Sequence, residues 1–92
     1  MSESFQRQFL IPNETGLHAR ASAKFVEVVE GFDATAEVSK DGMSAGGDSI
    51  MGLLMLGAAK GETVDVTTSG PDAQALIDAL EVLISGKFGE DA

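Results

Sequence analysis

The chain has no cysteine, no tryptophan and no tyrosine, and it contains a single histidine. Without cysteine it forms neither a disulfide nor a thiolate metal site, and nucleophilic catalysis by a thiol is excluded. One histidine likewise excludes a site in which two imidazoles bind one metal ion. We therefore expect no metal site and no cofactor. Because five phenylalanines are the only aromatic residues, the core must consist mainly of aliphatic side chains.

Basic residues are also scarce: 6 Lys and Arg stand against 15 Asp and Glu, which gives a net charge of -9. This balance argues against binding to nucleic acid or to an anionic membrane surface. No run approaches the roughly 18 consecutive apolar residues of a membrane helix, and the first ten residues do not resemble a secretory signal. We expect a monomeric cytoplasmic protein with one domain over residues 1–92 and a frayed tail at 88–92.

Hydrophobic periodicity in the first third of the chain predicts a strand and then a helix. Residues 5–11 alternate between apolar and polar side chains, as in a half-buried strand. Residues 19–30 instead show helical spacing, and Gly31 follows where a left-handed C-terminal cap is favoured. The predicted buried stripe of this helix consists of Ser22, Phe25, Val26 and Val29.

A hairpin and a short helix are predicted next. Residues 33–40 alternate as a strand, and Asp41-Gly42 is a strong signal for a two-residue turn into a short returning strand. The apolar segment that follows is predicted to be a helix with Asp48 or Ser49 as its N-cap. Either Gly57 or Gly61 ends it.

The last third of the chain predicts a strand over 62–69 and a long helix that begins near Pro71 and closes at Gly86. The order is therefore β-α-β-β-α-β-α. Half-polar strands with amphipathic helices favour an α+β fold with helices on one face of a mainly antiparallel sheet. The predicted buried stripe of the long helix consists of Ala73, Leu76, Ile77, Leu80, Leu83 and Ile84.

The single histidine stands at the start of the first predicted helix, in the stretch Gly16-Leu17-His18-Ala19-Arg20. A neutral imidazole is a nucleophile at cellular pH. The helix start offers backbone N–H groups, from Ala19 onward, and a positive dipole end that suits a phosphoryl group. Arg20 can add charge-assisted hydrogen bonds, and Gly16 allows the loop to turn tightly.

A simpler interpretation makes His18 only a helix cap beside a solvated arginine. The helix dipole disfavours a protonated imidazole at this position, and that cost brings no evident structural gain. This electrostatic cost slightly favours a functional role for His18 over a purely structural cap.

The residues Gly16-Leu17-His18-x-Arg20 resemble the active-site motif of HPr, the histidine-containing phosphocarrier family of the bacterial phosphotransferase system. Independently, residues 48–70 resemble the Ser-Ile-Met-Gly helix of this family and the strand after it. The resemblance covers nearly the whole chain. It implies an open-faced β-sandwich, in which three helices cover one face of a four-stranded antiparallel sheet.

The resemblance also implies a mechanism and partners. His18 would accept a phosphoryl group on Nδ1 from enzyme I, which phosphoenolpyruvate charges, and would pass it to a IIA-type protein. The Arg20 side chain and the backbone amide of Ala19 would stabilise the phosphoryl group. The protein would be a stoichiometric carrier and not a turnover enzyme.

Three departures from the family pattern concern rigidity and charge. Ala21 stands where the family usually has proline, and Glu27, Glu30 and Asp48 stand where lysine is common. Partners built for a basic carrier should therefore bind poorly. The stretches GFDAT, LLMLGAAKG and SGPDAQ look closer to the nitrogen-related NPr branch, which favours a regulatory relay.

The short helix carries two further expectations. In parts of the family the serine that matches Ser49 is phosphorylated by HPr kinase, although an N-cap alone also explains this residue. The helix has more apolar residues than one buried stripe needs, as expected for a docking surface shared by several partners. The predicted docking residues are Leu17, Ile50, Met51, Leu54 and Met55.

Two other functions compete with the phosphocarrier. One is a non-catalytic regulatory adapter that binds partners through the 49–56 helix; the presence of His18 weighs against it. The other is a small enzyme or metal-binding module, which ranks last because no second basic catalytic residue lies near His18 in the sequence.

Overall fold

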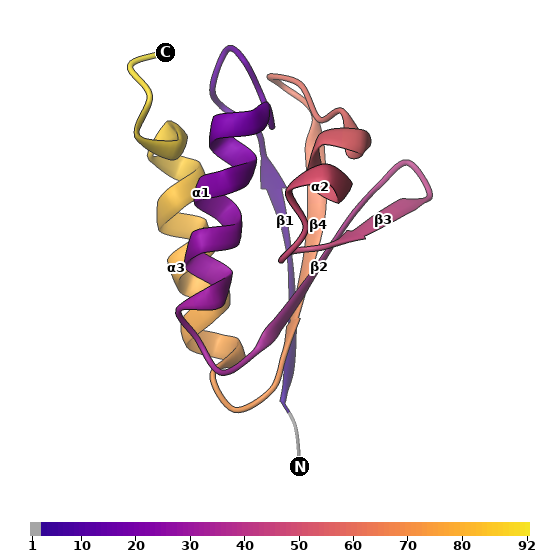
Figure 1. Ribbon diagram of the computed structural model, residues 1–92, viewed down its shortest axis with the longest axis vertical. Helices are drawn as coiled ribbons and strands as arrows, with labels where there is room; N and C mark the ends of the chain where they lie inside the picture. The colour runs from indigo at the N-terminus through magenta and orange to yellow at the C-terminus, as the bar shows by residue number, and fades with distance from the viewer. Residues whose placement is uncertain (1–2) are drawn as a thin grey trace.

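The computed structural model describes residues 3–92 and has the predicted order of strands and helices (Figure 1). A short 3-10 turn follows the last helix. The elements are β1 Ser4–Leu10, α1 Ala19–Glu30, β2 Thr35–Lys40, β3 Met43–Gly46, α2 Ile50–Leu56, β4 Thr63–Ser69, α3 Ala73–Ser85 and η1 Lys87–Gly89.

The four strands form one antiparallel sheet in the order β1-β4-β2-β3. In the central strand β4, Val64, Val66 and Thr68 are buried, whereas the alternating side chains are at least partly exposed. The helices cover one face of the sheet, with α1 and α3 side by side (Figure 1), and the other face is open. This arrangement is the expected open-faced β-sandwich. Within residues 3–92, no helix has the length and apolar character needed to cross a membrane.

The core lies between the helices and the buried face of the sheet. All four residues of the predicted α1 stripe are buried, and Ala21 is buried with them. On α3 the predicted stripe is buried except at Leu83, which is only partly covered. Burial of the larger apolar side chains among them holds the two layers together, since each Val, Leu, Ile or Phe side chain removed from water contributes about 1.5–3 kcal/mol.

The turn predicted at Gly42 and the helix end at Gly57, one of the two predicted alternatives, were confirmed, but the left-handed cap predicted at Gly31 was not. Asp41 and Gly42 have φ of 52° and 82°, the two left-handed residues of a tight hairpin turn. Gly57 ends α2 in the left-handed conformation. Gly31, in contrast, has φ -81°; its N–H donates to the Val28 carbonyl at 3.1 Å, and the Phe32 N–H donates to the Val29 carbonyl at 3.3 Å. The chain thus leaves α1 through one more right-handed turn, so the left-handed cap predicted there was wrong.

A frayed end was expected at 88–92; residues 87–90 instead form a turn, while residues 91 and 92 are exposed and lie outside any element. Lys87, Phe88 and Gly89 all have positive φ, of 58°, 56° and 78°. This turn folds the chain back, so that the Phe88 side chain is completely buried. Lys24 Nζ donates to the Phe88 carbonyl oxygen at 2.7 Å. The tail is therefore packed beside the start of α1 (Figure 1).

Candidate functional site

His18 is the N-cap of α1, as the sequence indicated. Its backbone is extended, and its Nδ1 atom accepts a hydrogen bond from the Arg20 backbone N–H at 3.3 Å. The His18 carbonyl accepts the Ser22 N–H at 2.9 Å, which closes the first turn of the helix. About a third of the imidazole is exposed to solvent. The ring therefore lies at the positive end of the helix and is accessible from outside.

The loop before His18 is held by a close backbone approach. Gly16 has φ +63°, and a Cβ atom there would lie 2.3 Å from the Ala58 carbonyl oxygen. The same carbonyl accepts the Leu17 N–H at 2.9 Å, and Asn13 Nδ2 donates to the Gly16 carbonyl at 2.9 Å. Only glycine fits this position, because it needs both the left-handed conformation and the missing side chain.

The two predicted phosphoryl-stabilising residues lie next to the ring. Ala19 is the first residue of α1, where a backbone N–H has no acceptor within its own helix. Arg20 is exposed, and its guanidinium forms no ion pair within the part of the chain that the structure describes. The backbone N–H groups of Ala19 and Arg20 thus lie at the helix start beside the ring, and the Arg20 guanidinium is open to solvent.

In addition to Ala19 and Arg20, a residue of the C-terminal tail that sequence reasoning missed, Glu90, contacts the ring. Glu90 Oε2 lies 2.7 Å from His18 Nε2. The other oxygen of Glu90, Oε1, accepts from Asn13 Nδ2 at 3.0 Å and from Thr15 Oγ1 at 2.9 Å. Glu90 is 72 positions from His18, next to a second acidic residue, Asp91, and no local pattern sets it apart.

These hydrogen bonds stabilise the ionised carboxylate. Donation from His18, Asn13 and Thr15 lowers the pKa of Glu90 from 4.5 to about 2. Since the folded-state pKa is the lower one, the contribution of Glu90 to stability is complete above about pH 4.5 and is lost as the pH falls toward 2.

We therefore expect the stability difference between wild type and Glu90→Gln to shrink from pH 5 to pH 2. Urea unfolding of both proteins at a series of pH values measures it. A difference that stays constant over this range would contradict the assignment.

Ser49 is the N-cap of α2, which resolves the choice between it and Asp48. Its Oγ atom accepts the Gly52 N–H at 3.0 Å. The hydroxyl is partly exposed, and Asp48 beside it is exposed. The unmodified serine therefore has a capping role, which by itself accounts for the residue.

Replacing Ser49 with alanine should lower the free energy of unfolding by about 1 kcal/mol, because the Gly52 N–H loses its acceptor. Ser49→Thr keeps a capping hydroxyl and should lose less. Urea unfolding of the two variants measures the difference, and equal losses would argue against the cap.

Of the five predicted docking residues, the four on α2 are exposed or partly exposed, and Leu17, which precedes α1, is buried. Met51 and Met55 are 68% and 70% exposed, Ile50 is exposed as well, and Leu54 is half-buried. Leu17, however, is only 5% exposed and belongs to the core. The buried Leu17 side chain therefore offers almost no surface to a partner.

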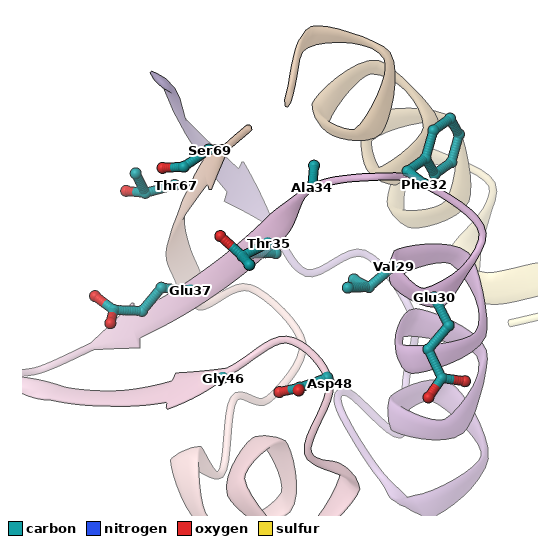
Figure 2. Close-up of a pocket in the computed structure, with 11 residues that line it drawn as sticks. Val29, Glu30, Phe32, Ala34, Thr35, Glu37, Gly46, Asp48, Thr67 and Ser69 are labelled. Atoms are coloured by element: carbon teal, nitrogen blue, oxygen red, sulfur yellow. The ribbon is translucent and has the colours of Figure 1, made fainter. Parts of the chain in front are cut away.

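A cavity of about 620 Å³ lies at the far end of α1, beside β2 and β4 (Figure 2). Glu30, Glu37 and Asp48 line it together with hydroxyl and small apolar side chains. Because Glu30 ends a helix of 12 residues that His18 begins, the two places are about 18 Å apart along the helix. The imidazole is thus on an open surface and not in this cavity.

Comparison with known proteins agrees with this geometry. Residues 5–86 match the family model described as the PTS HPr component phosphorylation site. The chain is 46% identical over 85 residues to the phosphocarrier protein HPr of Cupriavidus necator, covering 92% of this chain and 96% of that protein. It is 39% identical to the phosphocarrier protein NPr of Shewanella violacea, covering 92% and 93%.

The fold leads to the same group. The structure matches the crystal structure of HPr-C-His from Thermoanaerobacter tengcongensis with a TM-score of 0.91 and 39% identity, covering 96% of this chain and 99% of that one. The single histidine at an open helix start, the fold around it and these relatives agree: the chain belongs to the HPr family of phosphocarriers of the phosphotransferase system.

Proposed function

We propose that His18 is the phosphoryl carrier, accepting the group on Nδ1 from enzyme I and passing it to a histidine of a IIA-type protein. The observation that carries this proposal is the placement of Nδ1 at the N-cap of α1, 3.3 Å from the Arg20 backbone nitrogen. A phosphoryl group on Nδ1 would lie at the first backbone amides of the helix, where the dipole favours negative charge.

Ala19 and Arg20 then have separate roles in holding the phosphoryl group. The backbone N–H of Ala19 donates to a phosphoryl oxygen, and the guanidinium of Arg20 supplies charge from the solvent side. Exposure of Arg20 matters because a carrier must also release the group. A phosphoryl group enclosed on all sides would not reach the acceptor.

The exposed residues of α2 serve as the docking surface for enzyme I and the IIA-type acceptor in this proposal. Ile50, Met51 and Met55 present flexible apolar side chains, which adapt to more than one partner. Leu54 contributes only its exposed edge. This surface carries no charge of its own, so partner choice falls to the acidic residues around it.

Those acidic residues support the regulatory, nitrogen-related part of the proposal. Glu27, Glu30 and Asp48 are all exposed and would repel an acidic docking face. The relatives carry both names, HPr at 46% and NPr at 39% identity. Transfer from the phosphorylated protein to a nitrogen-type IIA protein, compared with a sugar-type one, tests the branch directly.

Ser49 is the proposed second phosphorylation site, with HPr kinase as the enzyme. Its hydroxyl is at a helix N-terminus, where a phosphate is electrostatically tolerated, and it borders the α2 docking surface. A phosphate there would add negative charge beside Asp48 and weaken binding of partners to α2.

The phosphocarrier proposal is tested by incubation with phosphoenolpyruvate and enzyme I, followed by measurement of acid-labile phosphate. Wild type should be labelled stoichiometrically, and His18→Ala should not be labelled at all. Ser49→Ala should still be labelled, while Met51→Asp should be labelled slowly, since it damages docking only. Labelling of His18→Ala at the wild-type level would overturn the proposal and favour a non-catalytic adapter.

A further inference from the structure

The contact between Glu90 and His18 is closer and better supported than a chance meeting of two surface groups. The Glu90 side chain is only 15% exposed. Both of its oxygens are engaged, Oε2 with His18 and Oε1 with Asn13 and Thr15. Asn13 is itself buried and also binds the Gly16 carbonyl, so the carboxylate is joined to the loop that precedes the histidine.

The backbone around Glu90 is held equally firmly. The Glu90 N–H donates to the Lys87 carbonyl at 2.9 Å, and the Gly89 N–H donates to the Gly86 carbonyl at 3.0 Å. The Phe88 side chain anchors this turn in the core, and the Lys24 ammonium holds the Phe88 carbonyl. The carboxylate is therefore delivered to His18 by a built turn and not by a loose tail.

The two hydrogen bonds of the imidazole assign its tautomer. An ionised carboxylate only accepts hydrogen bonds, so Nε2 must carry a proton that it donates to Glu90. A backbone N–H only donates, so Nδ1 must present a lone pair to Arg20. Only the neutral tautomer with hydrogen on Nε2 satisfies both neighbours.

We propose that Glu90 is a positioning residue of the phosphoryl relay: it keeps the proton on His18 Nε2, leaves Nδ1 as the nucleophile, and balances the charge that phosphorylation creates on the ring. This inference rests on the proposed carrier function of His18. A carboxylate that orients a histidine through its second nitrogen acts in the same way in metal sites and in serine proteases.

The atoms and charges of the transfer balance without a proton moving. The lone pair of Nδ1 forms a bond to phosphorus, and the bond from phosphorus to the donor histidine nitrogen breaks, with its electron pair remaining on that nitrogen. The Nε2–H bond stays intact. The imidazole ring thus becomes cationic, and the Glu90 carboxylate at 2.7 Å lies opposite the new charge.

The same contact favours release of the phosphoryl group. When the acceptor attacks phosphorus, the bond to Nδ1 breaks and its electron pair returns to Nδ1. Because Glu90 retains the Nε2 proton, the leaving group is a neutral imidazole, which leaves more readily than the imidazolate anion. Glu90 also occupies the space in front of Nε2, and phosphorylation is confined to Nδ1.

The test compares Glu90→Gln with Asp91→Asn in the full-length chain. Glutamine keeps the shape but removes the charge, and its amide cannot accept from His18, Asn13 and Thr15 together as the two carboxylate oxygens do. Asp91→Asn removes one carboxylate from the same tail at an exposed residue and serves as the matched control. Thermal unfolding of each variant ensures that measurements are made on folded protein.

Two readouts separate positioning from a merely structural role. Nitrogen-15 NMR of the neutral His18 ring should show one Nε2–H tautomer in wild type and Asp91→Asn, and a mixture of both tautomers in Glu90→Gln. The rate of phosphoryl transfer from enzyme I should fall by about 10-fold or more in Glu90→Gln, the usual effect of losing an orienting carboxylate.

The outcomes distinguish this inference from the carrier proposal. If wild type accepts phosphate on His18 but Glu90→Gln keeps both the single tautomer and the wild-type rate, the role of Glu90 is refuted and the carrier function stands. If wild type accepts no phosphate on His18, the carrier function itself fails. A change of tautomer together with a slower rate in Glu90→Gln alone supports the inference.

Discussion

Gly16→Ala is expected to destabilise the protein by about 2–4 kcal/mol and to slow phosphorylation of His18. A left-handed residue other than glycine costs about 1–2 kcal/mol. The new Cβ atom would also meet the Ala58 carbonyl oxygen at 2.3 Å, so the backbone must move and weaken the bond from the Leu17 N–H. Because His18 is the residue after Leu17, movement of this backbone displaces the imidazole.

Gly57→Ala provides a matched control for this prediction. Gly57 has the same φ of 63°, but nothing lies within 4 Å of its hypothetical Cβ atom. It should therefore lose only the backbone term, about 1–2 kcal/mol. Urea unfolding measures the loss in free energy of unfolding for each variant. Equal losses would show that the close contact with the Ala58 carbonyl does not add to the cost at Gly16.

Phe88→Ala should have the largest effect on folding, a loss of about 3–5 kcal/mol, because it empties a fully buried aromatic site. The variant should also free the tail that carries Glu90. We expect its His18 ring to lose the single tautomer, as in Glu90→Gln, although Glu90 itself is unchanged. Urea unfolding and nitrogen-15 NMR measure the two effects.

Val82→Ala is the control for an apolar truncation near the same end of α3. Val82 is exposed, so its loss should change stability by no more than about 0.5 kcal/mol in either direction. If Phe88→Ala were as stable as this control, the tail would not be anchored in the core, and the position of Glu90 would need another explanation.

Local chemistry predicted most of the fold. The apolar spacing of residues 19–30, the turn at Asp41-Gly42 and a cap at Asp48 or Ser49 each depend on neighbours within a few positions; the first two were confirmed, and the cap is Ser49. Gly31 was misjudged because a left-handed cap is one of several ways to end a helix. The turn after α1 places Phe32 against the core, and right-handed geometry achieves this without a left-handed residue.

The exposure of the proposed docking residues was predicted only in part for a similar reason. Exposure of Met51 and Met55 follows from their spacing on α2, since Leu53 and Leu56 take the buried stripe. Leu17 lies in a loop, where no periodicity says which way a side chain points. Its burial depends on tertiary contacts: it packs in the core, and its backbone N–H binds Ala58, a residue 41 positions later in the chain.

By itself the sequence determined the order of elements, the place of His18 at a helix start and its neighbours Ala19 and Arg20 within the motif, because all of these depend on short-range spacing. Only the tertiary structure decided which nitrogen of the imidazole is available. That choice depends on Glu90, which reaches the ring because Phe88 is buried and the chain turns back through three left-handed residues. Hydrophobic burial of one distant side chain thus places the charge that orients the histidine.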